Sequence, residues 1–238
     1  MRCSPPHIFI FDWDGTLSDS VGRIVICLRR AALDLGLEDL GDDAFSEVIG
    51  LGLPQAIAQL YPGLDADTGE RFRVGYAGHF IAEDIAPSKL FPKALEVLEE
   101  LRARGHYIAV ATGKSRRGLD RVLASMGMEG FFHATRCADE TASKPDPRMI
   151  LEIIEELGEA VEQAVVVGDT EYDMDMARRA GVAGIGVSYG VHSPQRLALY
   201  RPSLIVGCLS ELLDWVPGSS GEYVDADLCE KAGEADQR

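Results

Sequence analysis

Three short apolar runs constrain the fold of this chain more than any other feature, because each is followed at once by residues that suit a turn or a binding site. They comprise residues 8–11, 107–111 and 164–167, and they are rich in β-branched and aromatic side chains. Runs of this length and composition predict strands that are buried on both faces of a parallel sheet. Helix-like segments follow the runs, so we expect an α/β fold.

Two carboxylates, Asp12 and Asp14, follow the first predicted strand, and Thr112 and Gly113 follow the second. In open α/β sheets, ligands bind beyond the carboxyl ends of the strands. An aspartate at that point contributes little to packing, although either one could cap a turn before Gly15. Thr112 offers a hydroxyl, and Gly113 lets a backbone amide approach an anion closely, but an ordinary strand-end cap gives the same pattern.

A third polar group follows residues 164–167, where Asp169 and Asp173 lie four residues apart at the predicted start of a helix. This spacing places both carboxylates on one side of the helix, although capping by Asp169 with a solvated Asp173 is an alternative. Lys144 lies in a loop that two prolines stiffen. Together, carboxylates, a hydroxyl and an amine at one sheet edge indicate phosphoryl chemistry.

The rest of the chain divides into two predicted parts and a tail. Residues 20–86 show helical periodicity, and we interpret them as an all-α cap inserted into a Rossmann-like core of residues 1–19 and 87–216. Residues 217–238 are rich in glycine, serine and acids, which predicts disorder. Three further strand-like runs complete a predicted sheet of six strands: residues 132–137, 185–189 and 204–206.

Composition limits the classes of partner. The chain has 39 acidic and 23 basic residues, a net charge of −16 and a pI near 4.7, which argues against nucleic acid and anionic membranes. Near the N-terminus the longest apolar run is too short for a signal peptide or a membrane span, and the five cysteines are scattered. We therefore expect a cytoplasmic protein with free thiols. The polar groups at the sheet edge predict a small phosphorylated metabolite as the partner, and a monomer and a homodimer both stay open.

Four stretches together resemble the motifs of the haloacid dehalogenase superfamily, in the order and rough spacing of that family. They are Asp12-Trp-Asp-Gly-Thr16, Thr112-Gly113, Lys144-Pro145 and Gly168-Asp-Thr-Glu-Tyr-Asp173. The segment between the first two resembles the helical cap of the phosphoglycolate phosphatase-like branch. Any one stretch is a weak signal, whereas the set is specific and spans the chain from about residue 7 to residue 190.

The resemblance implies a phosphatase that forms an aspartyl-phosphate. Asp12 would be the nucleophile, and Asp14 would act as general acid and then as general base, roles that suit the chemistry of an anionic ester. Thr112, Gly113 and Lys144 would bind the phosphate. Gly113 stands where many members of the family carry asparagine, so a side-chain contact is missing at that position.

The resemblance also implies a magnesium site. Asp12 and Asp169 are the natural pair of carboxylate ligands, since Mg²⁺ keeps several waters and needs few protein ligands. In the family, the main-chain carbonyl at the position of Asp14 is a further ligand. Asp173 would act through a water molecule or by orienting the other groups.

Other functions use parts of the same pattern. A P-loop needs glycine where Ile108 stands, and a dinucleotide motif that starts at Gly184 needs glycine where Tyr189 stands. A dehalogenase would need neither a second acid nor a metal ligand. A phosphomutase would keep every residue of the set, and a phosphate-sensing module without activity also stays open. The substrate implied by the cap is phosphoglycolate, with small sugar phosphates as alternatives.

Overall fold

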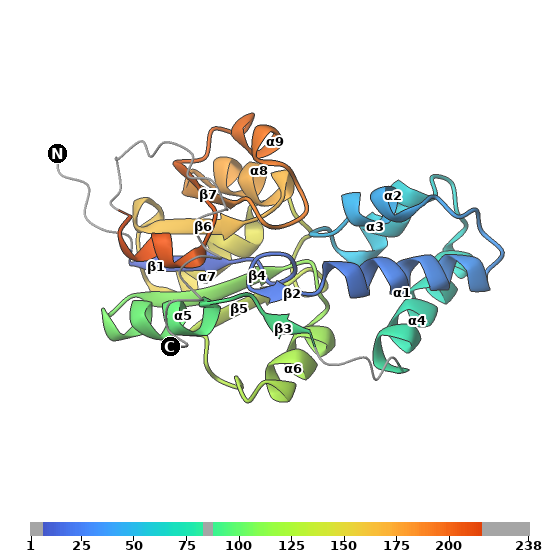
Figure 1. Cartoon of the computed structure of the whole chain (residues 1–238), viewed down its shortest axis with the longest axis horizontal. Coiled ribbons are helices and arrows are strands. Elements are labelled where there is room, and N and C mark those ends of the chain that lie inside the picture. The colour runs from blue at the N-terminus through green and yellow to red at the C-terminus, as the bar shows by residue number, and fades with distance from the viewer. Residues whose placement is uncertain (1–6, 83–87, 216–238) are drawn as a thin grey trace, which may run out of the picture.

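The structure is a computed structural model that describes residues 7–82 and 88–215 (Figure 1). Two of the predictions lie outside these residues: the disordered tail at 217–238, and the point where the cap would return to the core after residue 86. The described residues form a sheet with flanking helices, and beside it a segment made of helices alone (Figure 1).

A six-stranded parallel sheet has the strand order β5-β4-β1-β6-β7-β8, so the strand nearest the N-terminus lies in the middle. The predicted α/β fold with a parallel sheet is confirmed. One of the predicted strands is shifted, because β7 begins two residues before residue 185. The strands are β1 (Ile8–Phe11), β4 (Tyr107–Thr112), β5 (Ala134–Cys137), β6 (Ala164–Gly168), β7 (Ala183–Val187) and β8 (Leu204–Val206).

Helices cover both faces of the sheet, and β1 contributes to both hydrophobic layers. Phe9 and Phe11 belong to one buried cluster, and Ile8 and Ile10 belong to the other, as the two-residue period of a strand requires. The first layer packs against α5 (Ala94–Ala103), α6 (Arg116–Ser125) and the 3₁₀ helix η2 (Leu209–Leu213). The second packs against α7 (Arg148–Leu157) and α8 (Glu171–Ala180). The short helices η1 (Val161–Gln163) and α9 (Pro194–Ala198) precede β6 and β8.

The helical segment has a hydrophobic cluster of its own, in which Phe45 and Phe72 are fully buried. It lies to the right of the sheet in Figure 1. At its base, β2 (Ser18–Asp19) and β3 (Lys89–Leu90) pair in antiparallel fashion, a contact that the sequence did not predict. The division into cap and core stays a prediction. The four helices are α1 (Val21–Asp34), α2 (Asp42–Glu47), α3 (Leu53–Leu60) and α4 (Ala66–Ala82).

Two further observations concern the expected compartment. Within the described ranges, the structure has no helix that is both long enough and apolar enough to span a membrane. Cys27 and Cys137 are free and buried, as expected for these two thiols.

The layered core generates a stability prediction. Replacing the fully buried Ile10 by alanine should lower the free energy of unfolding by about 2–5 kcal/mol, because the tightly packed layer cannot close the cavity. Urea unfolding followed by circular dichroism measures the change. Leu199→Ala, at a side chain that is 78% exposed, is the control and should change the value by less than about 0.5 kcal/mol. Equal midpoints for Ile10→Ala and wild type would contradict the packing described for β1.

Candidate active site

The carboxyl ends of β1 and β6 bring together two acids that are far apart in the sequence. Phe11 pairs with Val167 in the parallel register of these strands, and the backbone amide of Asp12 donates a hydrogen bond to the carbonyl of Val167 at 2.9 Å. Asp169 follows directly after β6. Because neighbouring strands end at the same edge, both side chains leave the sheet at one place.

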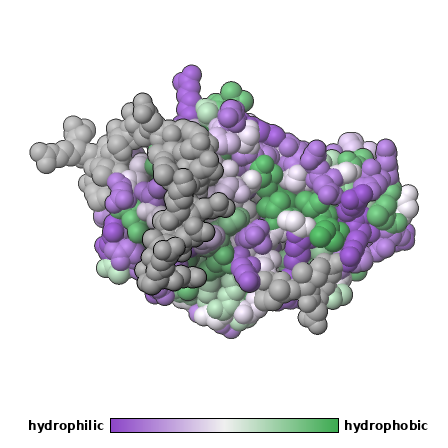
Figure 2. Space-filling model, viewed as in Figure 1, coloured by the Kyte–Doolittle hydropathy of each residue, from purple (hydrophilic) through white to green (hydrophobic). Residues whose placement is uncertain are grey.

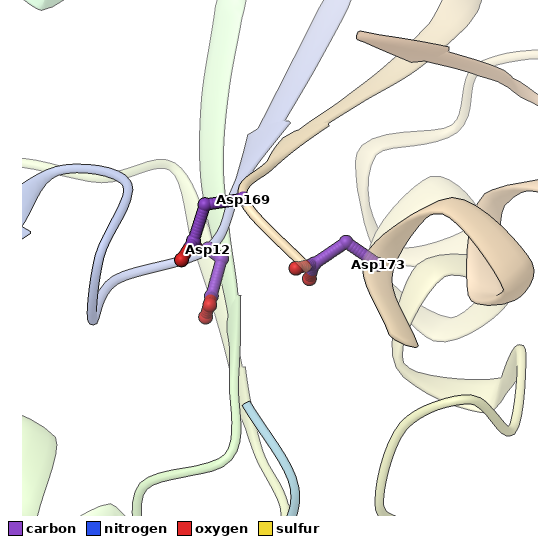
Figure 3. Close-up of side chains that lie close together, drawn as sticks. All are labelled: Asp12, Asp169 and Asp173. Atoms are coloured by element: carbon purple, nitrogen blue, oxygen red, sulfur yellow. The ribbon is translucent and has the colours of Figure 1, made fainter. Parts of the chain in front are cut away.

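Asp12, Asp169 and Asp173 form one buried cluster. One carboxylate oxygen of each residue lies within 4.8 Å of one from each of the other two, and all three side chains are closed off from solvent. Figure 3 shows the carboxylates of Asp12 and Asp169 at the strand ends and that of Asp173 directed toward them from the start of α8. Two ligands of one Mg²⁺ lie at most about 4 Å apart, so the spacing is close to that of a single cation site.

Lys144 brings a positive charge to this cluster from the loop before α7. Its Nζ lies 2.6 Å from Oδ1 of Asp12 and 2.7 Å from Oδ1 of Asp173. Burial opposes the charged form of the lysine, yet the two carboxylates raise its pKa above the ordinary value. Lys144 therefore stays an ammonium ion, and it ties β1 and α8 to a segment that lies between them in the sequence.

Asp169 is held in one orientation by its surroundings. The hydroxyl of Thr16 donates a hydrogen bond to its Oδ1 at 2.7 Å, and the amide of Val191 donates to its Oδ2 at 2.8 Å. Gly15 and Gly190 approach so closely that an added Cβ would lie 2.3 Å and 2.1 Å from side-chain atoms of Asp169. The sequence analysis assigned no role to these four neighbours. Thr16 and Gly15 belong to the first motif, but nothing in the sequence pointed to Val191 or Gly190.

Asp173 uses its two oxygens in different ways. Its Oδ2 accepts hydrogen bonds from the amide and the hydroxyl of Thr170, the residue that caps α8, whereas its Oδ1 contacts Lys144. Capping by Asp169 with a solvated Asp173, the alternative raised by the sequence, does not describe this helix, because Thr170 is the cap and Asp173 is fully buried.

Burial disfavours the charged forms of these carboxyl groups. It raises the pKa of Asp12 well above the ordinary value although Lys144 opposes the shift, and burial followed by the charge of Asp173 raises the pKa of Asp169 to about 7. Within the described residues, Oδ2 of Asp12 is buried without a hydrogen-bond partner. Three carboxylates with one ammonium group and a free ligand oxygen suit a hard divalent cation.

Asp14 lies beside this cluster but is not a member of it. Nζ of Lys114 lies 2.9 Å from its Oδ1, and the hydroxyl of Ser20 donates a hydrogen bond to the same oxygen at 2.5 Å. The ammonium of Lys114 also lies 5.0 Å from the ring centroid of Phe80 in the helical segment. Lys114 was missed as a site residue, although it directly follows Gly113.

Thr112 and Gly113 lie at the end of β4, where the loop between α2 and α3 contacts the sheet edge. The hydroxyl of Thr112 is buried and accepts a hydrogen bond from the amide of Lys114 at 3.2 Å. A Cβ on Gly113 would lie 2.4 Å from the carbonyl oxygen of Leu51 and 2.7 Å from that of Gly50. The missing side chain at Gly113 is therefore what allows the helical segment to approach so closely.

A cavity of about 610 Å³ lies between the helical segment and the sheet edge. Asp12, Asp14 and Gly113 line it, whereas Thr112, Lys144, Asp169 and Asp173 are not among its lining residues. A smaller hollow of about 360 Å³ near β7 contains none of the predicted site residues. The structure thus places the acids of the first motif beside a space that a small molecule can occupy.

Comparisons with known proteins agree with this geometry. The family described as haloacid dehalogenase-like hydrolase matches residues 9–187. A protein named probable phosphatase IndB, from Dickeya dadantii, is 33% identical over 210 residues, which cover 87% of this chain and 91% of the relative. Phosphoglycolate phosphatase from Agrobacterium fabrum is 34% identical, over 76% of this chain and 80% of the relative.

A solved structure is also similar over nearly its whole length. The crystal structure of a haloacid dehalogenase-like hydrolase from Bacteroides fragilis has a TM-score of 0.81 and 30% sequence identity to this chain. The similarity covers 87% of this chain and 99% of that one. The same arrangement of sheet and helices is therefore found in a protein whose structure was determined by crystallography.

The buried ion pairs generate a prediction. Lys144→Met should lower the free energy of unfolding, measured in urea with a chelator present, by about 3 kcal/mol, because it leaves Asp12 and Asp173 buried without a counter-charge. Lys89→Met, at an exposed lysine of β3, is the control and should stay within about 0.5 kcal/mol of wild type. A Lys144→Met variant as stable as wild type would mean that the ammonium does not compensate the cluster.

Proposed function

Because this chain belongs to the haloacid dehalogenase-like hydrolase family, we propose that it is an Mg²⁺-dependent phosphatase that acts on a small phosphomonoester through an aspartyl-phosphate. The observation that carries the proposal is the buried cluster of Asp12, Asp169 and Asp173, with Lys144 against two of them. Relatives named as phosphatases support phosphate esters as the substrate class.

The charges of the site support a requirement for a cation. At the reacting end, a phosphomonoester dianion would meet the three buried carboxylates with Lys144, and beside them Asp14 with Lys114, so carboxylates outnumber ammonium groups there. We propose that Asp12, Asp169 and the main-chain carbonyl of Asp14 hold Mg²⁺, and that Asp173 acts through water or by orienting Lys144. When bound, the cation supplies positive charge that stabilises the phosphoryl oxygens in the transition state.

The first half of the proposed reaction transfers the phosphoryl group to the protein. A carboxylate oxygen of Asp12 attacks phosphorus and forms an O–P bond, while the bond between phosphorus and the ester oxygen breaks. The ester oxygen leaves with the electron pair, and Asp14 donates a proton to it. Lys144 favours the ionised form of Asp12 and holds it in position, and Thr112 and the amide of Gly113 bind the phosphoryl oxygens.

The second half returns the protein to its starting state. Asp14, now ionised, removes a proton from a water molecule, and the water oxygen attacks phosphorus. The bond between phosphorus and Asp12 breaks, which releases inorganic phosphate and the free carboxylate. The contact of Asp14 with Lys114 and Ser20 keeps its carboxylate beside the cavity for both steps.

Two alternatives use the same residues. A phosphomutase would pass the phosphoryl group back to a sugar, so release of inorganic phosphate from a simple monoester distinguishes it from a phosphatase. A phosphate-sensing module would bind phosphate without turnover. Carbon–halogen chemistry is less well supported, because the cluster has more carboxylates than that reaction needs. Among phosphatase substrates, the names of the relatives favour phosphoglycolate, and small sugar phosphates follow.

The nucleophile is tested by Asp12→Asn. Release of phosphate from p-nitrophenyl phosphate with Mg²⁺ should fall at least about 1,000-fold, because an amide oxygen cannot form the covalent intermediate. Asp120→Asn, at an exposed residue of α6 outside the cavity, should keep the wild-type rate. Equal rates for Asp12→Asn and wild type would end the proposal that this site is catalytic.

The roles of Asp14 and Asp169 are separated by measuring metal binding and turnover together. Asp14→Asn should lower turnover about 100-fold or more while the Kd for Mg²⁺, measured by calorimetry, changes less than about threefold. Asp169→Asn should raise that Kd by at least about tenfold, because a charged ligand is lost. A large loss of Mg²⁺ affinity in Asp14→Asn would show that its side chain, and not its carbonyl, contributes to the metal site.

A further inference from the structure

The cavity over the carboxylate cluster is larger than phosphoglycolate or a small sugar phosphate requires. Its volume of about 610 Å³ lies within the range of sites that hold ligands of drug-like size, roughly 300–1,000 Å³. The helical segment already contacts the sheet loops around it, since the amide of Gly52 donates to the hydroxyl of Ser143 at 2.7 Å and the hydroxyl of Tyr172 donates to the carbonyl of Glu47 at 3.1 Å. The cavity is therefore present even though the helical segment and the loops of the sheet are in contact.

One side of α4 forms an apolar wall of this cavity. Tyr76, Ala77, Phe80 and Ile81 line it, at the spacing of a single helix face. The rings of Tyr76 and Phe80 lie 5.9 Å apart, and Ile81 is 52% exposed. On the face shown in Figure 2, apolar side chains also gather where the helical segment adjoins the sheet, over α1 and α3. Among the described residues, this face of α4 presents apolar side chains to the cavity, and the guanidinium of Arg23 lies 4.5 Å from the ring centroid of Phe80.

The charges around the cavity indicate what kind of ligand this is. Arg73, Lys114, Arg117 and Arg121 line it, in a chain whose net charge is −16. Arg117 and Arg121 lie one turn apart on α6 and have no ion-pair or hydrogen-bond partner in the part of the chain that the structure describes. Unpaired guanidinium groups attract an anion. An anionic small molecule matches this rim and the site of Asp12 better than a peptide or a second copy of this acidic chain.

We propose that the preferred substrate is a phosphomonoester with an apolar body, aliphatic or aromatic, which lies against Tyr76, Phe80 and Ile81 while its phosphate reaches Asp12. This inference rests on the proposed phosphatase function and names the substrate class of the same site. Phosphoglycolate, which is small and fully polar, leaves the wall of α4 in contact with water. Each methylene group buried there would raise kcat/KM about fourfold, the equivalent of its transfer out of water.

The first test is a series of n-alkyl phosphates from methyl to hexyl, compared with phosphoglycolate at fixed Mg²⁺. Their alkoxide leaving groups are similar in basicity, so the trend in kcat/KM reports contact with the body of the ester. We expect kcat/KM to rise about two- to fourfold per methylene group, and hexyl phosphate to exceed phosphoglycolate at least about tenfold. Flat values along the series, or a preference for phosphoglycolate, would overturn the inference and leave the phosphatase function intact. No phosphate release from any ester would instead overturn the function itself.

The second test uses two matched side chains of α4. Ile81 and Val74 are similarly exposed, at 52% and 55%, but Ile81 lines the cavity and Val74 does not. Ile81→Ser should reduce the ratio of kcat/KM for hexyl to methyl phosphate by about three- to tenfold, through KM, and Phe80→Ala should reduce it further. Val74→Ser should keep the wild-type ratio. Circular dichroism checks that both variants are folded. If Ile81→Ser and Phe80→Ala both keep the wild-type ratio of kcat/KM for hexyl to methyl phosphate, the apolar part of the ester does not lie against α4 and the proposal is contradicted.

Discussion

The contact of Lys144 with Asp12 and Asp173 is the interaction on which the rest of the site depends. Buried carboxylates that lie this close repel one another, and burial alone already favours their protonated forms. One ammonium group between two of them lowers that cost and fixes the loop before α7 against the edge of the sheet. Under the proposed function, a bound cation would neutralise the negative charge that remains.

The fold follows from local patterns to a large degree. The alternation in β1, with Phe9 and Phe11 on one face and Ile8 and Ile10 on the other, needs only the two-residue period of a strand and helices on both sides. The pairing of β2 with β3 could not be read in this way, because each has two residues and their contact depends on where the helical segment leaves and rejoins the sheet. The early start of β7 was not predictable for another reason, because its glycines give no hydrophobic signal that marks a strand.

The candidate site also has a part that the sequence predicts and a part that it does not. Asp12 and Asp169 were predictable as neighbours because both follow buried strands, and parallel strands end at one edge. The support of Asp169 by Val191 and Gly190 was not predictable, since it comes from a loop after β7 whose path the sequence does not encode in any short pattern. Lys114 was not predictable for a different reason: a lysine after a strand-end glycine does not reveal which carboxylate its flexible side chain will contact.

Chemistry and substrate choice have different origins in this molecule. The groups that would carry out phosphoryl transfer lie at the ends of strands, where the backbone fixes them, and membership of the family accounts for their presence. The wall formed by Tyr76, Phe80 and Ile81 lies on α4, which packs against α1 and α3 inside the helical segment. Its side chains can therefore differ among relatives without disturbing the carboxylate cluster. Gly113 joins the two parts, because its missing side chain lets the loop before α3 rest on the sheet edge. A relative's substrate is therefore a weaker guide to this chain than the apolar surface that its own α4 presents to the cavity.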